Sequence, residues 1–134
     1  MSSATEIMIY VVDDDYAVRD SLRFLLESHG MSVRDFGSIG EFVAGYAPFP
    51  RACLILDLHL PVVGGLDFLA SPAGRALEIP VIMVTGRSDD ATRARAQELG
   101  AEAFLEKPID DSALVHVIGA AIERRSSRAN GRHR

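Results

Sequence analysis

At its centre the chain reads Ala52-Cys53-Leu54-Ile55-Leu56-Asp57, an unbroken apolar run that ends at a carboxylate. The run has the length of a strand but lacks the polar-apolar alternation of a half-exposed strand. A strand that is apolar on both faces is typical of a parallel sheet covered by helices on each side. Three similar runs are each closely followed by polar residues: 7–12 by Asp13 and Asp14, 81–84 by Thr85, and 103–105 by Lys107.

Stretches with the period of a helix separate these apolar runs. The first is an apolar stripe that ends before Gly30, a residue type suited to the position after a helix: Val18, Leu22, Leu25 and Leu26. A short strand is expected over 32–36. Further helices are predicted to begin near Ser38, Leu66, Asp89 or Asp90, and Asp110 or Asp111. Five alternations of strand and helix indicate an α/β fold of the (βα)5 type.

Two of these helices are expected to depart from a regular, well-packed helix. Pro72 and Gly74 would cut the third helix short, because proline cannot continue a helix. The fourth helix has few large apolar residues beyond Leu99. We therefore expect it to pack weakly against the sheet and to be adjustable in position.

The polar residues that follow the apolar runs are expected to meet at one edge of the sheet. Ligands of parallel α/β sheets bind beyond the carboxyl ends of the strands, near the point where the strand order reverses. Carboxylates gather a hard divalent cation, whereas a lysine and a hydroxyl suit the oxygens of a phosphoryl group. Each feature alone is common, but their joint occurrence points to a phosphoryl-binding site: Asp13, Asp14, Asp57, Thr85 and Lys107.

Composition fits one ordinary globular domain. The chain has 134 residues, of which 48% are hydrophobic and 25% charged, so it can bury a core without a disulfide or a structural metal. Its single cysteine, Cys53, lies within an apolar run and is expected to be a core residue. No stretch is apolar enough to span a membrane and the first residues do not resemble a signal peptide, so a cytoplasmic location is expected.

The sequence resembles the receiver domain of bacterial two-component response regulators, a CheY-like superfamily, and most closely its FixJ/NarL-type members. The resemblance spans about residues 7–123 and is carried by these stretches: Tyr10-Val-Val-Asp-Asp14, Leu54-Ile-Leu-Asp-Leu-His-Leu-Pro61 with Gly65, Pro80-Val-Ile-Met-Val-Thr-Gly86, and Gly100-Ala-Glu-Ala-Phe-Leu-Glu-Lys-Pro108. It implies a flavodoxin-like, doubly wound sheet of five parallel strands in the order 2-1-3-4-5. Residues 1–123 would then form the receiver domain.

The resemblance also implies a role for each polar residue at the sheet edge. Asp57 would accept a phosphoryl group from a phosphohistidine. Asp14 would bind Mg²⁺ directly and Asp13 through water, with Asp57 and the backbone carbonyl of His59 completing the protein ligands. Lys107 would pair with the phosphoryl oxygens, Thr85 would hydrogen-bond one of them, and a cis peptide bond before Pro108 would turn Lys107 into the site. Charge neutralisation of this kind is what phosphoryl transfer asks of a protein.

Switching and lifetime residues follow from the same resemblance. Thr85 and Phe104 match the positions that move on phosphorylation, although Phe104 could also be a simple core residue. The fourth helix, fifth strand and last helix would form the output face. His59 and Arg87 lie two residues beyond Asp57 and Thr85 and would tune the lifetime of the aspartyl phosphate, although His59 could also be an exposed loop side chain.

The expected partners are a sensor histidine kinase, or a histidine phosphotransfer protein, and a second copy of the chain after phosphorylation. Residues 124–134 hold five arginines and no acid, and we expect a disordered tail or linker stub rather than an arm that binds nucleic acid. No helix-turn-helix pattern follows Ile122, so specific DNA binding by this chain is not expected. The domain is also not expected to bind a membrane.

Three other functions compete with a phosphoacceptor receiver. A haloacid-dehalogenase-like phosphatase also uses an aspartyl phosphate, but that family carries its nucleophile in an Asp-x-Asp pair on the first strand, whereas Asp57 is expected on the third. A receiver-like binding module that is never phosphorylated would not need all five site residues. A receiver fragment of a FixJ-type transcriptional regulator is the third. The expected chemistry is limited to self-phosphorylation and self-dephosphorylation, so the chain is not expected to be an enzyme.

Overall fold

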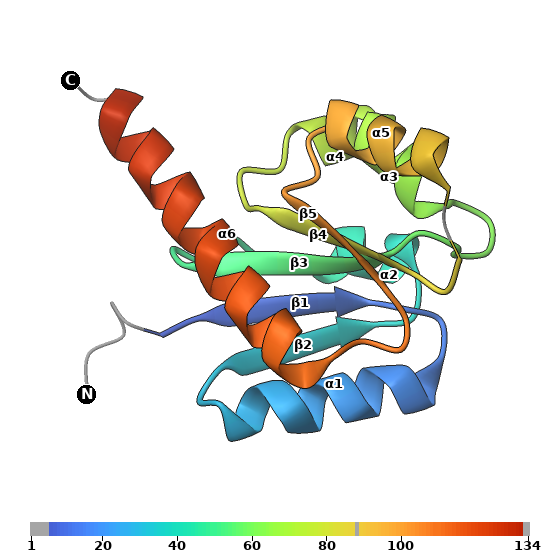
Figure 1. Ribbon diagram of the computed structural model, residues 1–134, viewed down its shortest axis with the longest axis horizontal. Helices are drawn as coiled ribbons and strands as arrows, with labels where there is room; N and C mark the ends of the chain where they lie inside the picture. The colour runs from blue at the N-terminus through green and yellow to red at the C-terminus, as the bar shows by residue number, and fades with distance from the viewer. Residues whose placement is uncertain (1–5, 88, 133–134) are drawn as a thin grey trace.

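A computed structural model describes residues 6–87 and 89–132, except the side chains of 126–132. Five parallel strands form one sheet in the order β2-β1-β3-β4-β5 (Figure 1). The flavodoxin-like sheet with strand order 2-1-3-4-5 is therefore confirmed. The strands are β1 (Met8–Val12), β2 (Ser32–Phe36), β3 (Ala52–Asp57), β4 (Val81–Thr85) and β5 (Ala103–Glu106).

Helices cover both faces of the sheet, and each face has its own core. On one face α1 (Tyr16–Ser28) and α6 (Asp111–Arg132) pack side chains such as Leu26 and Ile118 against the strands. On the other face lie α2 (Ile39–Gly45), α3 (Gly65–Ala70), α4 (Pro72–Arg75) and α5 (Asp90–Glu98) (Figure 1). Alternate residues of a strand serve the two cores, which is why β3 is apolar and buried at every position before Asp57.

Side-chain caps begin α1, α2 and α5, and for α2 and α5 the cap is a residue that the sequence predicts. Asp15 accepts hydrogen bonds from the N–H groups of Ala17 and Val18 and so begins α1. Ser38 caps α2 in the same way, and of the two candidates before α5 it is Asp89 that accepts from the N–H of Thr92. Gly30 follows α1 with a φ of 84°, a conformation that favours glycine.

The third predicted helix is split in two. Residue Ser71 has an extended backbone between α3 and α4, and Pro72 begins α4, where its missing N–H leaves no hydrogen bond unmade. The helices predicted as fourth and fifth therefore correspond to α5 and α6. Of the residues of α5 only Ala96 is buried, in agreement with the weak packing expected for it.

The last helix is longer than expected. Instead of giving way to a disordered tail after residue 123, α6 continues to Arg132 and runs on past the sheet (Figure 1). No proline interrupts 124–132, and arginine and alanine are good helix formers. The side chains of Arg124 and Arg125 approach the carboxylate of Glu102 at 3.4 and 3.5 Å. Position 123 is therefore not the end of the last helix.

None of the helices in the described part of the chain is long and apolar enough to cross a membrane.

Candidate functional site

The strand register brings the polar residues to one edge of the sheet. Val12 pairs with Leu56, Asp57 with Val84, and Thr85 with Glu106, so that β1, β3, β4 and β5 end side by side. The residues that follow these strands lie at the carboxyl edge, as the sequence predicts.

Three carboxylates gather at this edge. Asp13, Asp14 and Asp57 each offer an oxygen, and these oxygens lie within 4.8 Å of one another. Asp13 and Asp57 are almost fully buried, with 3% and 5% of their surfaces exposed, whereas Asp14 is exposed. The set contains only hard oxygen donors and excess negative charge, which fits Mg²⁺ better than a softer metal.

Asp57 is held by one contact at each carboxylate oxygen. Its Oδ1 accepts a hydrogen bond from the N–H of His59 at 3.1 Å, and its Oδ2 lies 3.7 Å from Nζ of Lys107. Burial raises the pKa of the Asp57 carboxyl above its ordinary value. The N–H of His59 opposes this rise in pKa, and the nearby charge of Asp13 adds to it.

Lys107 joins two of the carboxylates. Its Nζ donates to Oδ2 of Asp13 at 3.1 Å and faces Asp57, while its own N–H donates to the Thr85 carbonyl at 2.7 Å. The peptide bond between Lys107 and Pro108 is cis. Burial alone would lower the pKa of Lys107, but the hydrogen bond to Asp13 and the two carboxylate charges raise it. The ammonium is therefore charged at neutral pH.

Thr85 is buried, but its hydroxyl is engaged within its own loop. The hydroxyl donates to the carbonyl of Arg87 at 2.7 Å and accepts from the Arg87 N–H at 3.2 Å. The ring Nε2 of His59 lies 3.5 Å from the same carbonyl. His59 thus connects the loops that follow β3 and β4. Beside Thr85, a Cβ added at Gly86 would meet no atom within 4 Å.

Phe104 lies outside the polar cluster, on β5. Its ring is half-buried against the core on the α5 side, and the guanidinium of Arg93 from α5 stacks 4.7 Å from its centroid. The structure thus places Phe104 between the sheet and α5. Its role as a switch stays a prediction.

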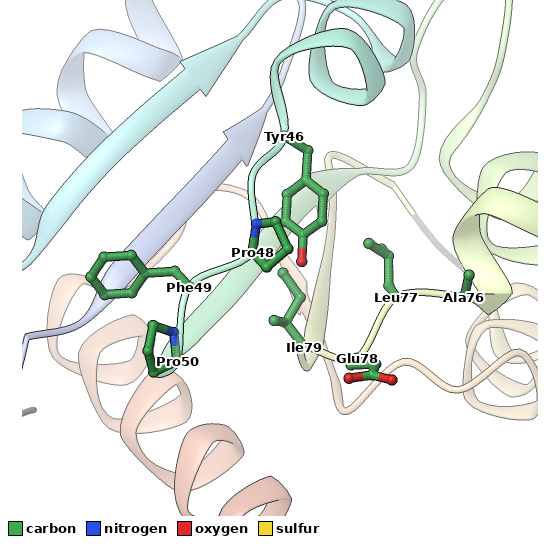
Figure 2. A pocket seen from close by; sticks show the side chains of 8 residues that line it. All are labelled: Tyr46, Pro48, Phe49, Pro50, Ala76, Leu77, Glu78 and Ile79. Carbon is green, nitrogen blue, oxygen red and sulfur yellow. The ribbon is translucent and has the colours of Figure 1, made fainter.

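A cavity at the opposite end of the sheet holds none of these residues. It measures about 550 Å³ and lies between the loops that precede β3 and β4. Figure 2 shows its side chains, which are largely apolar apart from the hydroxyl of Tyr46 and the carboxylate of Glu78. Its lining residues include no cluster of metal ligands, and none of the predicted site residues is among them.

Sequence reasoning missed Arg19, which contacts the acidic loop directly. Its Nη1 donates to the backbone carbonyl of Asp13 at 2.7 Å. The only signal in the sequence is its spacing, four residues after the cap Asp15 on the first turn of α1.

Comparison with known proteins identifies the family to which this fold belongs. The family model described as "Response regulator receiver domain" matches residues 9–119. The chain belongs to this family. Two curated relatives are the transcriptional regulatory protein FixJ of Azorhizobium caulinodans, 40% identical over 116 residues, and nodulation protein W of Bradyrhizobium diazoefficiens, 38% identical over 122.

These relatives are longer than the receiver domain they share. The matches cover 87% and 91% of this chain but 55% and 54% of the relatives, so the chain spans about half their length. Among solved structures, full-length FixJ from B. japonicum superposes with a TM-score of 0.79 at 35% identity, covering 92% of this chain and 61% of that one. The FixJ-N structure gives 0.77 at 32% identity, covering 87% and 94%. The receiver is therefore FixJ-like, as the sequence predicts.

Proposed function

We propose that this receiver accepts a phosphoryl group onto Asp57, in a Mg²⁺-dependent reaction, from a sensor histidine kinase or histidine phosphotransfer protein. The observation that carries the proposal is the position of Lys107, whose ammonium touches Asp13 and faces Asp57 among three clustered carboxylates. A cytoplasmic location belongs to the same proposal, because a sensor kinase draws its phosphoryl group from ATP.

Asp57 is suited to be the nucleophile. One of its oxygens attacks phosphorus while the phosphorus–nitrogen bond of the donor phosphohistidine breaks, and the imidazole leaves with the bonding electrons. The ammonium of Lys107 lies beside the attacking carboxylate, where it offsets the charge of the incoming dianion. Thr85 would turn its hydroxyl from the Arg87 carbonyl to a phosphoryl oxygen.

The metal-binding residues would be Asp13, Asp14, Asp57 and the backbone carbonyl of His59. Mg²⁺, when bound, would neutralise phosphoryl oxygens during transfer. The exposed Asp14 is free to serve as a direct ligand, whereas Asp13 already holds Lys107 and the N–H of Asp15. That division fits the direct and water-mediated roles that the family resemblance implies.

The signal would leave through the face formed by α5, β5 and α6. Capture of the Thr85 hydroxyl by the phosphoryl group would free the loop after β4, which leads into α5. Phe104 lies where a shift of α5 would change its packing, and α5 is held by little buried surface. The chemistry of the chain would be limited to gaining and losing this phosphoryl group, as for a signalling protein and not an enzyme.

A second candidate concerns the chain's place in a larger protein. Curated relatives named transcriptional regulatory proteins are about twice as long as the stretch they share with it. The receiver would then control a DNA-binding region, with contact to DNA made outside these residues. Specific DNA binding by residues 1–134 alone would contradict the proposal that DNA is contacted by another part of the protein.

Intact mass spectrometry after incubation with acetyl phosphate tests the proposal. We expect one added phosphoryl group with Mg²⁺, none with chelator and none in Asp57→Asn, while Asp20→Asn, a change on the exposed surface of α1, behaves as wild type. If no adduct is seen, Mg²⁺-dependent binding of beryllofluoride would indicate rapid hydrolysis. The absence of both would mean a receiver that has kept these residues without the chemistry.

A further inference from the structure

Arg19 connects the acidic loop to the neighbouring strand. From α1, its Nη1 donates to the Asp13 carbonyl at 2.7 Å and its Nε donates to Oδ2 of Asp35, on β2, at 2.9 Å. Only 16% of its side chain is exposed. Hydrogen bonds from a charged donor are short and strong, and the planar guanidinium can make both at once.

The surroundings leave this guanidinium little freedom. A Cβ added at Gly37 would lie 3.4 Å from Nη1, and the ring of Tyr16 lies 5.5 Å from the guanidinium carbon. Asp35 is itself held by a second arginine, Arg23. Arg19 is therefore held in place by its partners and does not move as a free surface side chain.

The carbonyl that Arg19 holds belongs to the peptide joining Asp13 to Asp14. A peptide unit is planar, so holding its oxygen also orients the N–Cα bond of the next residue. Asp13 is held at three further points. Its N–H donates to the Phe36 carbonyl, its Oδ1 accepts from the N–H of Asp15, and its Oδ2 accepts from the ammonium of Lys107. Within the described part of the chain, no hydrogen bond or ion pair holds the side chain of the exposed Asp14, so the direction of its carboxylate depends on this peptide.

We propose that Arg19 is a positioning residue for the Mg²⁺ site, acting through the Asp13–Asp14 peptide. The inference rests on the proposed function only in that Asp13 and Asp14 hold the cation. Some groups do not touch the metal but hydrogen-bond to its ligands and orient them. Removing such a group typically lowers metal affinity 10- to 100-fold. Lysine is a poor replacement, because one ammonium cannot reproduce the guanidinium's two directed bonds.

Arg23 supplies a matched control. It lies one turn further along α1, also bonds Asp35, and contacts Glu27 and the Val33 carbonyl, but it has no bond to the acidic loop. Arg19→Met and Arg23→Met therefore both remove an arginine from Asp35. Only Arg19→Met also releases the Asp13 carbonyl.

The experiment is a Mg²⁺ titration of each variant in the absence of a phosphodonor, followed by the NMR shifts of the Asp14 and Asp57 amides. We expect affinity to fall about tenfold or more in Arg19→Met, to fall clearly in Arg19→Lys, and to change less than about twofold in Arg23→Met. With acetyl phosphate, the Mg²⁺ concentration for half-maximal phosphorylation should rise in Arg19→Met, while the rate at saturating Mg²⁺ stays near wild type.

Equal Mg²⁺ affinity in the folded Arg19→Met and Arg23→Met variants would overturn the inference. If Arg19→Met does not fold, Arg19→Lys decides by the same comparison with Arg23→Met. A wild-type chain that binds no Mg²⁺ would overturn this inference together with the proposed function. Wild-type binding and phosphorylation with no effect of Arg19 would overturn the inference alone.

Discussion

Asp57 and Asp35 show how neighbours give the same side chain opposite properties. Burial raises the pKa of Asp57, and the single ammonium of Lys107 does not reverse that effect. Burial would also raise the pKa of Asp35, but the hydrogen bonds from Arg23 and Arg19 outweigh it, and the pKa is lowered. The ionised carboxylate of Asp57 therefore destabilises the folded state, as is common in reactive sites, whereas the ionised carboxylate of Asp35 stabilises it.

Removing the charge of Asp57 should therefore stabilise the metal-free domain. Because its folded-state pKa lies above the unfolded value of 3.8, the folded state binds the proton more tightly, and ionisation destabilises the fold above the folded-state pKa. In chelator, we expect Asp57→Asn to increase the free energy of unfolding at pH 7. The difference from wild type should shrink as the pH falls toward 3.8. Urea unfolding at several pH values measures it.

Asp35→Asn is the control of opposite sign. The stability that Asp35 contributes is present above pH 3.8 and is lost as the pH falls through its lower folded-state pKa. We expect Asp35→Asn to cost about 1 kcal/mol at pH 7, since the ion pairs are partly exposed, and less in acid. Equal effects of the two substitutions at pH 7 would contradict this assignment of pKa shifts.

His59 and Arg87 should set how long the phosphoryl group stays on Asp57. Nε2 of His59 lies 3.5 Å from the Arg87 carbonyl, in the loops that follow Asp57 and Thr85, and the family resemblance gives both positions this role. We expect His59→Ala and Arg87→Ala to change the decay several-fold while the adduct still forms. Intact mass after removal of acetyl phosphate follows the decay, with His29→Ala, an exposed residue that caps the C-terminal end of α1, as the control. Unchanged decay in both variants would rule out the role.

At the scale of elements, strands were more predictable than helix ends. An unbroken apolar run such as β3 is typical of a strand buried on both faces, so its type follows from the sequence. The order of the strands followed from the family resemblance. The length of α6 did not follow, because the basic, acid-free stretch 124–132 resembles a linker and yet contains no proline to end the helix. Neither did the choice of Asp89 over Asp90 as the cap of α5, since both can accept the same hydrogen bond.

The start of α3 packs so closely on β3 that only glycine fits. A Cβ at Gly65 would lie 2.6 Å from the Asp57 carbonyl and 2.9 Å from Cε of Met83. We expect Gly65→Ala to lower the free energy of unfolding by about 2 kcal/mol and to slow phosphorylation, because the backbone of Asp57 must shift. Gly119→Ala, inside α6 with no atom within 4 Å of the new Cβ, should instead stabilise by roughly 0.5–1 kcal/mol. Urea unfolding of both variants measures the difference. Equal changes in the free energy of unfolding would contradict the close approach of Gly65 to the Asp57 carbonyl.

At the scale of the whole molecule, the site could be predicted because topology alone assembles it. Parallel strands bring Asp57, Thr85 and Lys107 to one edge whatever the detailed packing. The finer contacts could not be predicted in the same way. Whether the Thr85 hydroxyl turns to Arg87, and whether Arg19 reaches the Asp13 carbonyl, depends on side-chain directions that only the packed structure fixes.

The same topology leaves β5 at the edge of the sheet, with α5 lightly packed beside it. The β5 residues Ala103, Phe104 and Leu105 are only partly buried. We expect phosphorylation to change the packing of this face and to favour pairing of two copies through α5, β5 and α6. Sedimentation velocity with beryllofluoride and Mg²⁺ should then give a mass moving from 14.5 kDa toward twice that value as concentration rises. Asp57→Asn should remain a monomer under the same conditions, and equal sedimentation of the wild type with and without beryllofluoride would count against this face as a phosphorylation-dependent interface.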